Sequence, residues 1–177
     1  MTVKDLLYFF PRKYEDRRTV TSIIEAPFNQ DVLLEVRVVK KVASGNPYSK
    51  KRVLRVLVED NTGNIELLFF NAKYLVNYFN SGDELSLFGK ITLNNGRRQM
   101  AHPEFHRIGD EGDIRGIFPV YPLTDGLTQA NMRNLQKEVR KYAFMLNEWL
   151  PEEIVEKNNL ASPSYSVENI HFPIAER

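Results

Sequence analysis

An aromatic cluster near the middle of the chain is the first candidate for chemistry. The segment GNIELLFFNAKYLVNYFNSGDEL carries five aromatic side chains within eleven residues, namely Phe69, Phe70, Tyr74, Tyr78 and Phe79. An exposed aromatic ring can stack on an unpaired nucleobase, and each such stack is worth roughly 1–3 kcal/mol. A buried aromatic ring instead fills a hydrophobic core. The first question is therefore which of these rings face outward.

The residue pattern around the cluster separates the rings into two groups. In IELLFF, the alternation of a strand places Phe69 in the core and Phe70 on the other face. AKYLVNYF is typical of a two-turn helix in which Leu75 and Phe79 share one side and Tyr74 lies on the adjacent stripe. Phe70 and Tyr74 are therefore expected to stand together at the mouth of the barrel that the neighbouring strands predict. The alternative is that the helix plugs the barrel and both rings merely seal it.

Basic residues gather near this cluster, although the whole chain has a formal net charge of only +1. Between Val36 and Val58 there are seven Lys or Arg residues and no acid: Arg37, Lys40, Lys41, Lys50, Lys51, Arg52 and Arg55. Between Gly89 and Arg107 the basic residues outnumber Glu104, the one acid there: they are Lys90, Arg97, Arg98 and Arg107. A locally basic surface on a neutral protein suits a polyanion. A solvated strand face explains the charges equally well.

The sequence lacks motifs for catalysis or metal binding, so we expect neither kind of site. The pair Gly89-Lys90 is followed by Ile91 in a strand-like segment, whereas a phosphate-binding loop needs GxxxxGK[ST]. His102 and His106 stand four apart in HPEFH, but a strand-like segment with a proline would not place them on one helix face. The sequence has no cysteine, which excludes disulfides, cysteine-ligated zinc and a thiol nucleophile. His102 is more simply a polar surface residue or a phosphate contact.

Length and composition indicate a globular protein of one domain, or one domain with an appendage. The 177 residues are 42% hydrophobic and 27% charged, which is ordinary for this class. No apolar run approaches the roughly 18 residues of a membrane span. The N-terminal segment MTVKDLLYFF lacks the layout of a signal peptide. We therefore expect a cytoplasmic protein that does not contact a membrane.

The sequence pattern predicts a mainly β fold with flanking helices. Thr2 can cap a short helix that ends at Pro11, and the charged residues 12–19 are expected to form a loop held by ion pairs. Period-two segments predict five strands with a short helix between the third and fourth, at 31–42, 51–60, 65–70, 84–93 and 97–108. This order is that of an OB-fold, a partly open five-stranded barrel. Gly89 would permit the coiling of a small barrel, and Pro103 marks an edge or a bend. An SH3-like barrel and a small sandwich remain alternatives.

The C-terminal third is expected to be an extended, proline-punctuated linker followed by helices. Thr128 can cap a long helix over residues 128–150, and Pro151 can start a shorter one. The long helix would carry an apolar stripe that lacks a partner, formed by Met132, Leu135, Val139, Tyr142 and Leu146. No element is assigned to the tail. The predicted domains are an N-terminal helix and charged loop over 1–19, an OB-fold over 20–109, and the linker with its helical segment over 110–177.

Several segments together resemble one bacterial protein family. They are TVKDLLYFFPRKYEDRR, EDNTGNIELLFFN, GKITLNNGRRQMAHPEF, IFPVYPLTDGLTQANMRNL and NIHFP, in this order over nearly the whole chain. In order and spacing they are similar to the N-terminal part of the ATP-dependent DNA helicase RecG family. In that family this region holds the wedge domain, an OB-fold that splits the arms of a stalled replication fork. Two motor domains follow it.

The resemblance implies roles for particular residues. Phe70 matches the aromatic of the family's FFN segment, and Tyr74 matches a second aromatic that some members carry four residues further on. By resemblance, the two rings stack on the bases at the branch point, one on each template strand. Phosphate contacts would come from Lys50, Lys51, Arg52, Arg97 and Arg98, helped by Gln99 and His102. Asn71 and Lys90 complete the set of candidate DNA-binding residues.

The resemblance also implies a function, that of a wedge domain that binds replication forks or Holliday junctions in DNA repair and recombination. The family's helical segment before TVKDLL is missing and the chain stops where the motor domains would begin, so we expect a fragment. ATP and Mg²⁺ would belong to the missing motor domains, and no cofactor is expected in this chain. Its expected partners are branched DNA and its own motor domains, and the fragment itself is expected to be a monomer. Two alternatives stay open, an RNA- or tRNA-binding OB module and a protein-interaction scaffold.

Overall fold

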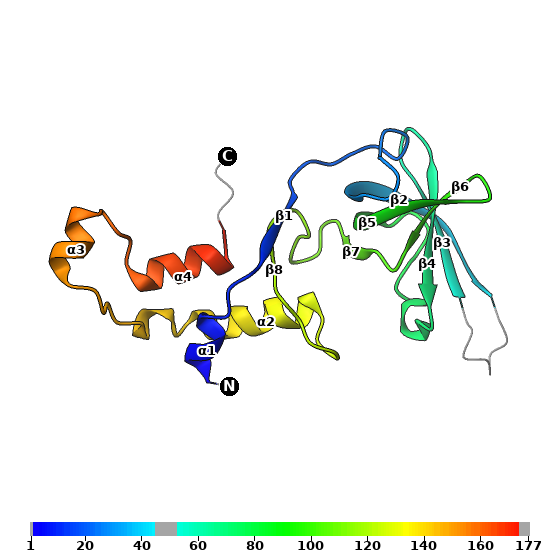
Figure 1. Ribbon diagram of the computed structural model, residues 1–177. Helices are drawn as coiled ribbons and strands as arrows, with labels where there is room; N and C mark the ends of the chain where they lie inside the picture. Colours follow the sequence, from blue (N-terminus) through cyan, green and yellow to red (C-terminus); the bar gives the residue numbers. More distant parts are fainter. Residues whose placement is uncertain (1, 45–52, 174–177) are drawn as a thin grey trace. The chain divides into compact units, whose positions relative to one another are not determined.

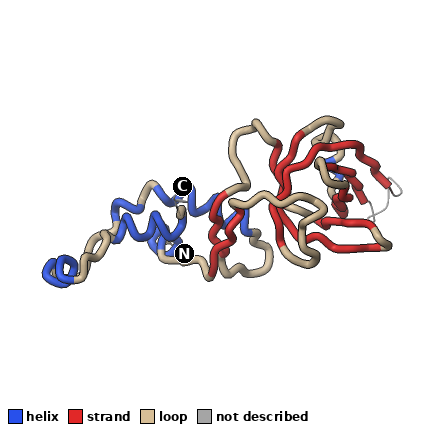
Figure 2. Tube along the Cα trace, turned by 90° about the horizontal axis from the view of Figure 1, so that it is seen from above, coloured by secondary structure: helices blue, strands red, loops and turns tan. Residues whose placement is uncertain are grey.

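The computed structural model describes residues 2–44 and 53–173 and divides the chain into two compact units (Figure 1). One unit, the sheet unit, is Arg17–Gly116. The other, the terminal unit, is built from both ends of the chain, Met1–Asp16 and Ile117–Arg177. In Figure 2 the α-helices belong to the terminal unit and most strands to the sheet unit. No helix in the described residues is long and apolar enough to cross a bilayer.

The sheet unit is a β-sheet that closes on itself. Its strands are β2 (Asp31–Ser44), β3 (Val53–Glu59), β4 (Asn64–Phe70), β5 (Glu84–Asn94), β6 (Arg97–Ala101) and β7 (Glu104–Arg107). β2 pairs with both β3 and β5, while β4 pairs in parallel with β6, and β6 pairs with β5. These pairings form a ring of five strands. β7 pairs with the N-terminal half of β5, from Leu85 to Phe88. The ring confirms the predicted OB-fold class.

The core of the sheet unit follows the predicted alternation. On β3 and β4 every second side chain is at most 3% exposed: Leu54, Val56, Val58, Ile65, Leu67 and Phe69. Side chains of a strand point alternately to opposite faces, so the intervening residues face outward. The predicted fifth strand is present as β6 and β7, which are separated at His102 and Pro103. The positive φ of 46° at His102 marks this bend.

Gly89 lies where β5 changes partners. Residues Glu84 to Lys90 of β5 pair with β2, and residues Ile91 to Asn94 pair with β6. A Cβ atom on Gly89 would lie 3.2 Å from Met100 Sδ and 3.4 Å from the Cα atom of Pro103. Both distances are tight, so the absence of a side chain lets the strand curl closely against its neighbours.

The terminal unit holds the flanking helices and differs from the sequence prediction in three places. α1 (Val3–Leu7) is capped by Thr2 as predicted. The charged loop is wrong in part, because Lys13–Arg17 forms β1, which pairs with β8 (Gly116–Val120). The predicted long helix is also too long, since α2 (Gln129–Arg140) gives way to the 3₁₀ turn η2 (Ala143–Met145). α3 (Glu152–Lys157) is present, and the tail forms the unassigned helix α4 (Pro163–His171).

The apolar stripe of α2 has a partner inside the terminal unit, contrary to the expectation that it lacks one. Val139 packs with Leu7 of α1, Ala143 of η2 and Val167 of α4 in a small buried cluster. Ala143 is 2% exposed, so the apolar cluster continues past the end of α2 into η2.

A buried histidine joins three parts of the terminal unit. The hydroxyl of Tyr121 lies 2.8 Å from Nδ1 of His171, and Nε2 of His171 lies 2.8 Å from the carbonyl oxygen of Leu7. A carbonyl can only accept, so Nε2 carries the proton and Nδ1 accepts from the Tyr121 hydroxyl. Burial lowers the pKa of His171 below its ordinary value, although the hydrogen bond to Leu7 acts in the opposite direction. The neutral imidazole is therefore the form that this unit needs.

Mild acid is expected to destabilise the terminal unit through His171. Because the pKa of His171 is lower in the folded chain, the unfolded chain binds more protons once the pH falls below the ordinary histidine pKa of about 6.5. The contribution of His171 to the free energy of unfolding should thus be fully present above that pH and decrease below it. Urea unfolding between about pH 7.5 and 5.5, followed by the helical circular dichroism signal, measures this. In His171→Gln the profile should be flat over that range, and an equally sloping profile would contradict the assignment.

Candidate nucleic-acid interface

Phe70 is the last residue of β4, and its ring faces outward. Its side chain is 46% exposed, whereas that of Phe69 is 2% exposed. The chain then turns at Asn71, whose φ of 56° lies in the left-handed region that asparagine tolerates better than most residues. The outward orientation predicted for Phe70 is therefore confirmed.

The short helix predicted after Phe70 is present, but as a 3₁₀ turn in place of two helical turns. η1 (Lys73–Leu75) continues as a turn in which Leu75 N–H donates to Ala72 and Tyr78 N–H donates to Leu75. Leu75 and Phe79 enter the core at 6% and 0% exposure, as predicted, and Tyr74 is 80% exposed. So short a segment gains little from α-helical bonds, and the need to bury its apolar residues decides its shape.

The inward rings pack together in a cluster beneath this turn. Phe79 lies 5.4 Å from Phe69 and 5.0 Å from Phe105, measured between ring centroids, and Tyr78 lies 5.1 Å from Phe105. Such distances are typical of favourable aromatic pairs. The aromatic cluster thus divides into rings that build the core and two that face solvent. We call the solvent-facing pair, Phe70 and Tyr74, the aromatic tip.

The two rings of the aromatic tip have separate supports. Among the described residues no ring contact joins Phe70 to Tyr74, and the ring beside Phe70 is that of His102, at 5.5 Å. The turn that carries Tyr74 is held by Lys41, whose Nζ donates to the carbonyl oxygens of Val76 and Phe79, both at 2.7 Å. Lys41 therefore works as a clamp on the turn, a role that its place in a basic run did not indicate.

A second cation, Arg107, also holds this turn. Arg107 Nη2 donates to the carbonyl oxygen of Tyr78 at 2.7 Å and to Asp83 at 2.9 Å. Its guanidinium lies 5.0 Å from the centre of the Tyr78 ring. Because Lys41 and Arg107 both donate to its backbone carbonyl oxygens, the turn that carries Tyr74 is held in place.

A groove on the outer face of the sheet unit is the basic surface of this region. It encloses about 480 Å³ and is lined by Lys40, Val42, Arg55, Leu57, Glu66 and Arg97. The one acid, Glu66, is already paired with Arg55 at 3.1 Å and accepts a hydrogen bond from Gln99 at 2.7 Å. A positively charged groove suits the backbone of a nucleic-acid strand. Lys40 and Arg55 are not among the predicted site residues. The alternation of β3 places Arg55 outward, whereas the register of β2 shifts between Val38 and Lys40, so alternation from Val36 and Val38 alone would place Lys40 inward.

The other residues in the predicted set lie in different environments. Arg97 is exposed in the groove, and Lys90 is exposed on β5. Arg98 is occupied, because its guanidinium donates to the carbonyl oxygens of Ile24 and Ala26 and lies 4.5 Å from the Phe28 ring.

Two of the predicted residues, Gln99 and His102, make contacts within the protein. Gln99 is 7% exposed, and its amide is held by Glu66 and Asn94. His102 lies beside Phe70. Lys50, Lys51 and Arg52 fall outside the described residues.

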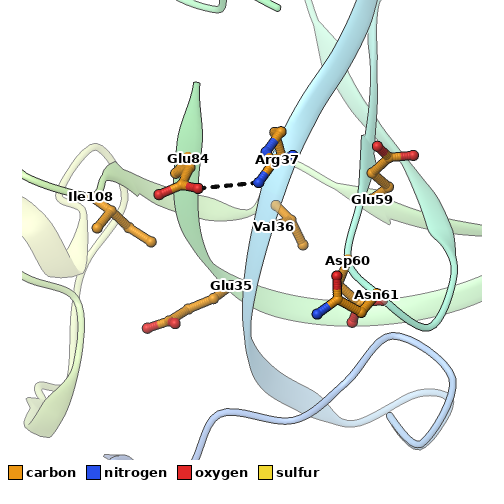
Figure 3. Close-up of a pocket in the computed structure, with 8 residues that line it drawn as sticks. All are labelled: Glu35, Val36, Arg37, Glu59, Asp60, Asn61, Glu84 and Ile108. Atoms are coloured by element: carbon orange, nitrogen blue, oxygen red, sulfur yellow. Dashed lines mark ion pairs between the residues drawn. The ribbon is translucent and has the colours of Figure 1, made fainter. Parts of the chain in front are cut away.

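A second pocket of the sheet unit has the opposite charge. Figure 3 shows Glu35, Glu59, Asp60 and Glu84 around Arg37, which pairs with Glu84 at 3.5 Å. Burial alone would raise the pKa of Asp60, but hydrogen bonds from Thr62 and from the Ile23, Thr62 and Gly63 amides outweigh it and hold the pKa below its ordinary value. Asp60 therefore carries its negative charge at neutral pH. The acidic lining of this pocket is unsuited to phosphate, so the groove is the better surface for a polyanion.

Comparison with known proteins gives one consistent family. The family model of the RecG wedge domain matches residues 1–142. The chain is 30% identical to the ATP-dependent DNA helicase RecG of Thermotoga maritima and 31% identical to that of Aquifex aeolicus, over 97% of its own length in each case. It spans only 22% and 23% of the length of these relatives. A solved structure of RecG bound to a three-way DNA junction superimposes with a TM-score of 0.81 and 30% identity, covering 97% of this chain and 24% of that one.

Proposed function

The chain belongs to the RecG wedge domain family, and from this premise we propose that it binds branched DNA with the aromatic tip at the branch point. The observation that carries the proposal is the aromatic tip itself. Phe70 and Tyr74 are 46% and 80% exposed, next to a core in which Phe69 and Phe79 are sealed. Exposed rings on a rigid support are suited to stack on unpaired nucleobases. The likeness to a RecG structure that holds a three-way DNA junction supports the same assignment.

The groove supplies the other half of the proposed contact. Lys40 and Arg97 would neutralise phosphates of one strand as it leaves the branch point, whereas the charge of Arg55 is already balanced by Glu66. Phosphate contacts carry no sequence information, so binding should be independent of sequence. Each neutralised phosphate should contribute about −0.9 to the slope of log K against log salt.

In a full-length RecG protein such an aromatic tip would act as a divider. A motor that pulls the duplex toward Phe70 and Tyr74 would force its strands apart, because the rings would take the place of the next base pair. The chain spans about a quarter of a RecG relative, so ATP hydrolysis and translocation are assigned to the remainder of such a protein. Its place in repair and recombination belongs to the same proposal.

Binding to a fork, a linear duplex and an RNA fork of matched length tests this function. Fluorescence anisotropy at about 50 and 200 mM salt should show the DNA fork bound most tightly and all three weakened by salt. A preference for the RNA fork would favour an RNA-binding module instead. Binding to none of them at low salt would oppose the proposal and favour a protein-interaction scaffold.

Two adjacent lysines should respond differently to the same substitution. Lys40→Met removes a groove cation, so it should weaken fork and duplex binding alike and reduce the salt slope by about one. Lys41→Met removes the clamp on the Tyr74 turn, so it should reduce the preference for fork over duplex and destabilise the sheet unit by about 1–2 kcal/mol. Binding isotherms at two salt concentrations and urea unfolding measure both effects. Identical behaviour of the two variants would show that Lys41 has no role beyond its charge.

A further inference from the structure

We propose that His102 is the positioning residue of Phe70, an inference that rests on the proposed function of the aromatic tip. The sequence suggested His102 as a direct DNA contact. In the structure, Phe70 N–H donates to Nε2 of His102 at 3.1 Å, and the two rings lie 5.5 Å apart. The imidazole is also edge-on to the buried Phe69 ring at 6.0 Å. His102 thus contacts both the ring that faces outward and the ring that anchors it.

The hydrogen bond to Phe70 continues a strand ladder that the backbone interrupts. β4 and β6 pair in parallel, with Leu68 opposite Ala101, and His102 N–H donates to the Leu68 carbonyl oxygen at 2.9 Å. In an unbroken parallel ladder, the next bond would join Phe70 N–H to the carbonyl oxygen of His102. The chain instead bends at His102, where φ is 46°, and enters Pro103. The imidazole nitrogen takes over the role of that carbonyl.

This substitution of side chain for backbone fixes the last residue of β4. β3 also pairs with β4 up to Phe70, which lies opposite Val53. The bond to His102 adds the constraint on the side of β4 that faces β6, so the Phe70 amide is held on the side where the backbone of β6 turns away. Since Nε2 accepts, the proton of the neutral imidazole resides on Nδ1.

Two variants separate the hydrogen bond from the backbone bend. His102→Asn keeps a residue that tolerates positive φ, but its side-chain oxygen corresponds to Nδ1 and is too short to reach the Phe70 amide. His102→Gln places its oxygen near the position of Nε2 and can accept the bond. Circular dichroism of both variants checks that the sheet unit still folds.

The first arm of the test needs no DNA. Hydrogen exchange of the Phe70 amide, followed by NMR in the 177-residue chain, should be faster in His102→Asn and return toward the native rate in His102→Gln. An unchanged rate in His102→Asn would overturn the positioning role, whatever the chain binds.

The second arm is a double-mutant cycle on a three-way DNA fork. His102→Asn should weaken fork binding about two- to tenfold in the native background and have no further effect when Phe70 is already alanine. His102→Gln should recover most of the loss. An equal loss in both backgrounds would overturn the proposal and make His102 a DNA contact, and no loss in the native background would overturn it as well. If Phe70→Ala alone leaves fork binding intact, the proposed function fails, and the exchange arm still decides the role of His102.

Discussion

The double variant Phe70→Ala/Tyr74→Ala is expected to lose the preference for forked over linear DNA while it keeps its affinity for duplex. The two rings are exposed and face away from the core, so their removal leaves the groove cations in place. Each lost stack is worth roughly 1–3 kcal/mol, and 1.4 kcal/mol corresponds to a factor of ten. Fork affinity should therefore fall about tenfold or more, toward the affinity for duplex. Competition between labelled fork and unlabelled duplex measures the ratio directly.

A matched control keeps this prediction specific. Tyr165 is a 61% exposed tyrosine of the terminal unit, and Tyr165→Ala should leave the fork-to-duplex ratio unchanged. The salt slope of the double variant should also equal that of the native chain, because no cation has been removed. An equal fall in fork and duplex affinity would mean that the rings do not contribute to the preference for the branch point.

Phe79→Ala is expected to reduce the free energy of unfolding of the sheet unit by about 3–5 kcal/mol. Phe79 is fully buried, and its ring packs against Phe69 and Phe105 beneath the turn that carries Tyr74. The deletion leaves a cavity that the surrounding strands cannot close. Urea unfolding, followed by the circular dichroism of the strands, measures the loss.

Tyr74→Ala is the natural comparison for Phe79→Ala, since it lies in the same turn. Its side chain is 80% exposed, so its substitution should change stability by no more than about 0.5 kcal/mol. A similar loss of stability in both variants would mean that Tyr74 seals the core and is unavailable to DNA. That result would support the view that the outer rings merely plug the barrel.

The sheet unit could be predicted in detail because its signals are local. Alternation over six residues is enough to place Phe69 inside and Phe70 outside, and the structure confirms both positions. The N-cap of α1 is equally local, since Thr2 and Asp5 bond each other across three residues. The contact of Phe70 and Tyr74 with DNA stays a prediction.

The remaining parts depend on partners far away in the sequence. Lys41 reaches carbonyls 35 and 38 residues away, and Arg98 reaches one 74 residues away, so a count of charges assigns both to a basic surface. β1 exists because β8 pairs with it, and no period within a charged stretch could indicate that. α4 is a different case, because Ser162 at the N-cap and Pro163 in the first turn are a local start signal, so this helix could be predicted from the sequence.

The most direct test of the account places a fluorescent base analogue at the branch point. Forks would carry 2-aminopurine either at the junction or a full helical turn inside one arm, at saturating protein. If the aromatic tip receives the branch-point bases, the native chain should change the fluorescence at the junction only, and Phe70→Ala/Tyr74→Ala should abolish that change. Equal changes at both positions, or a junction signal that survives the double variant, would contradict the assignment of Phe70 and Tyr74 to the branch point.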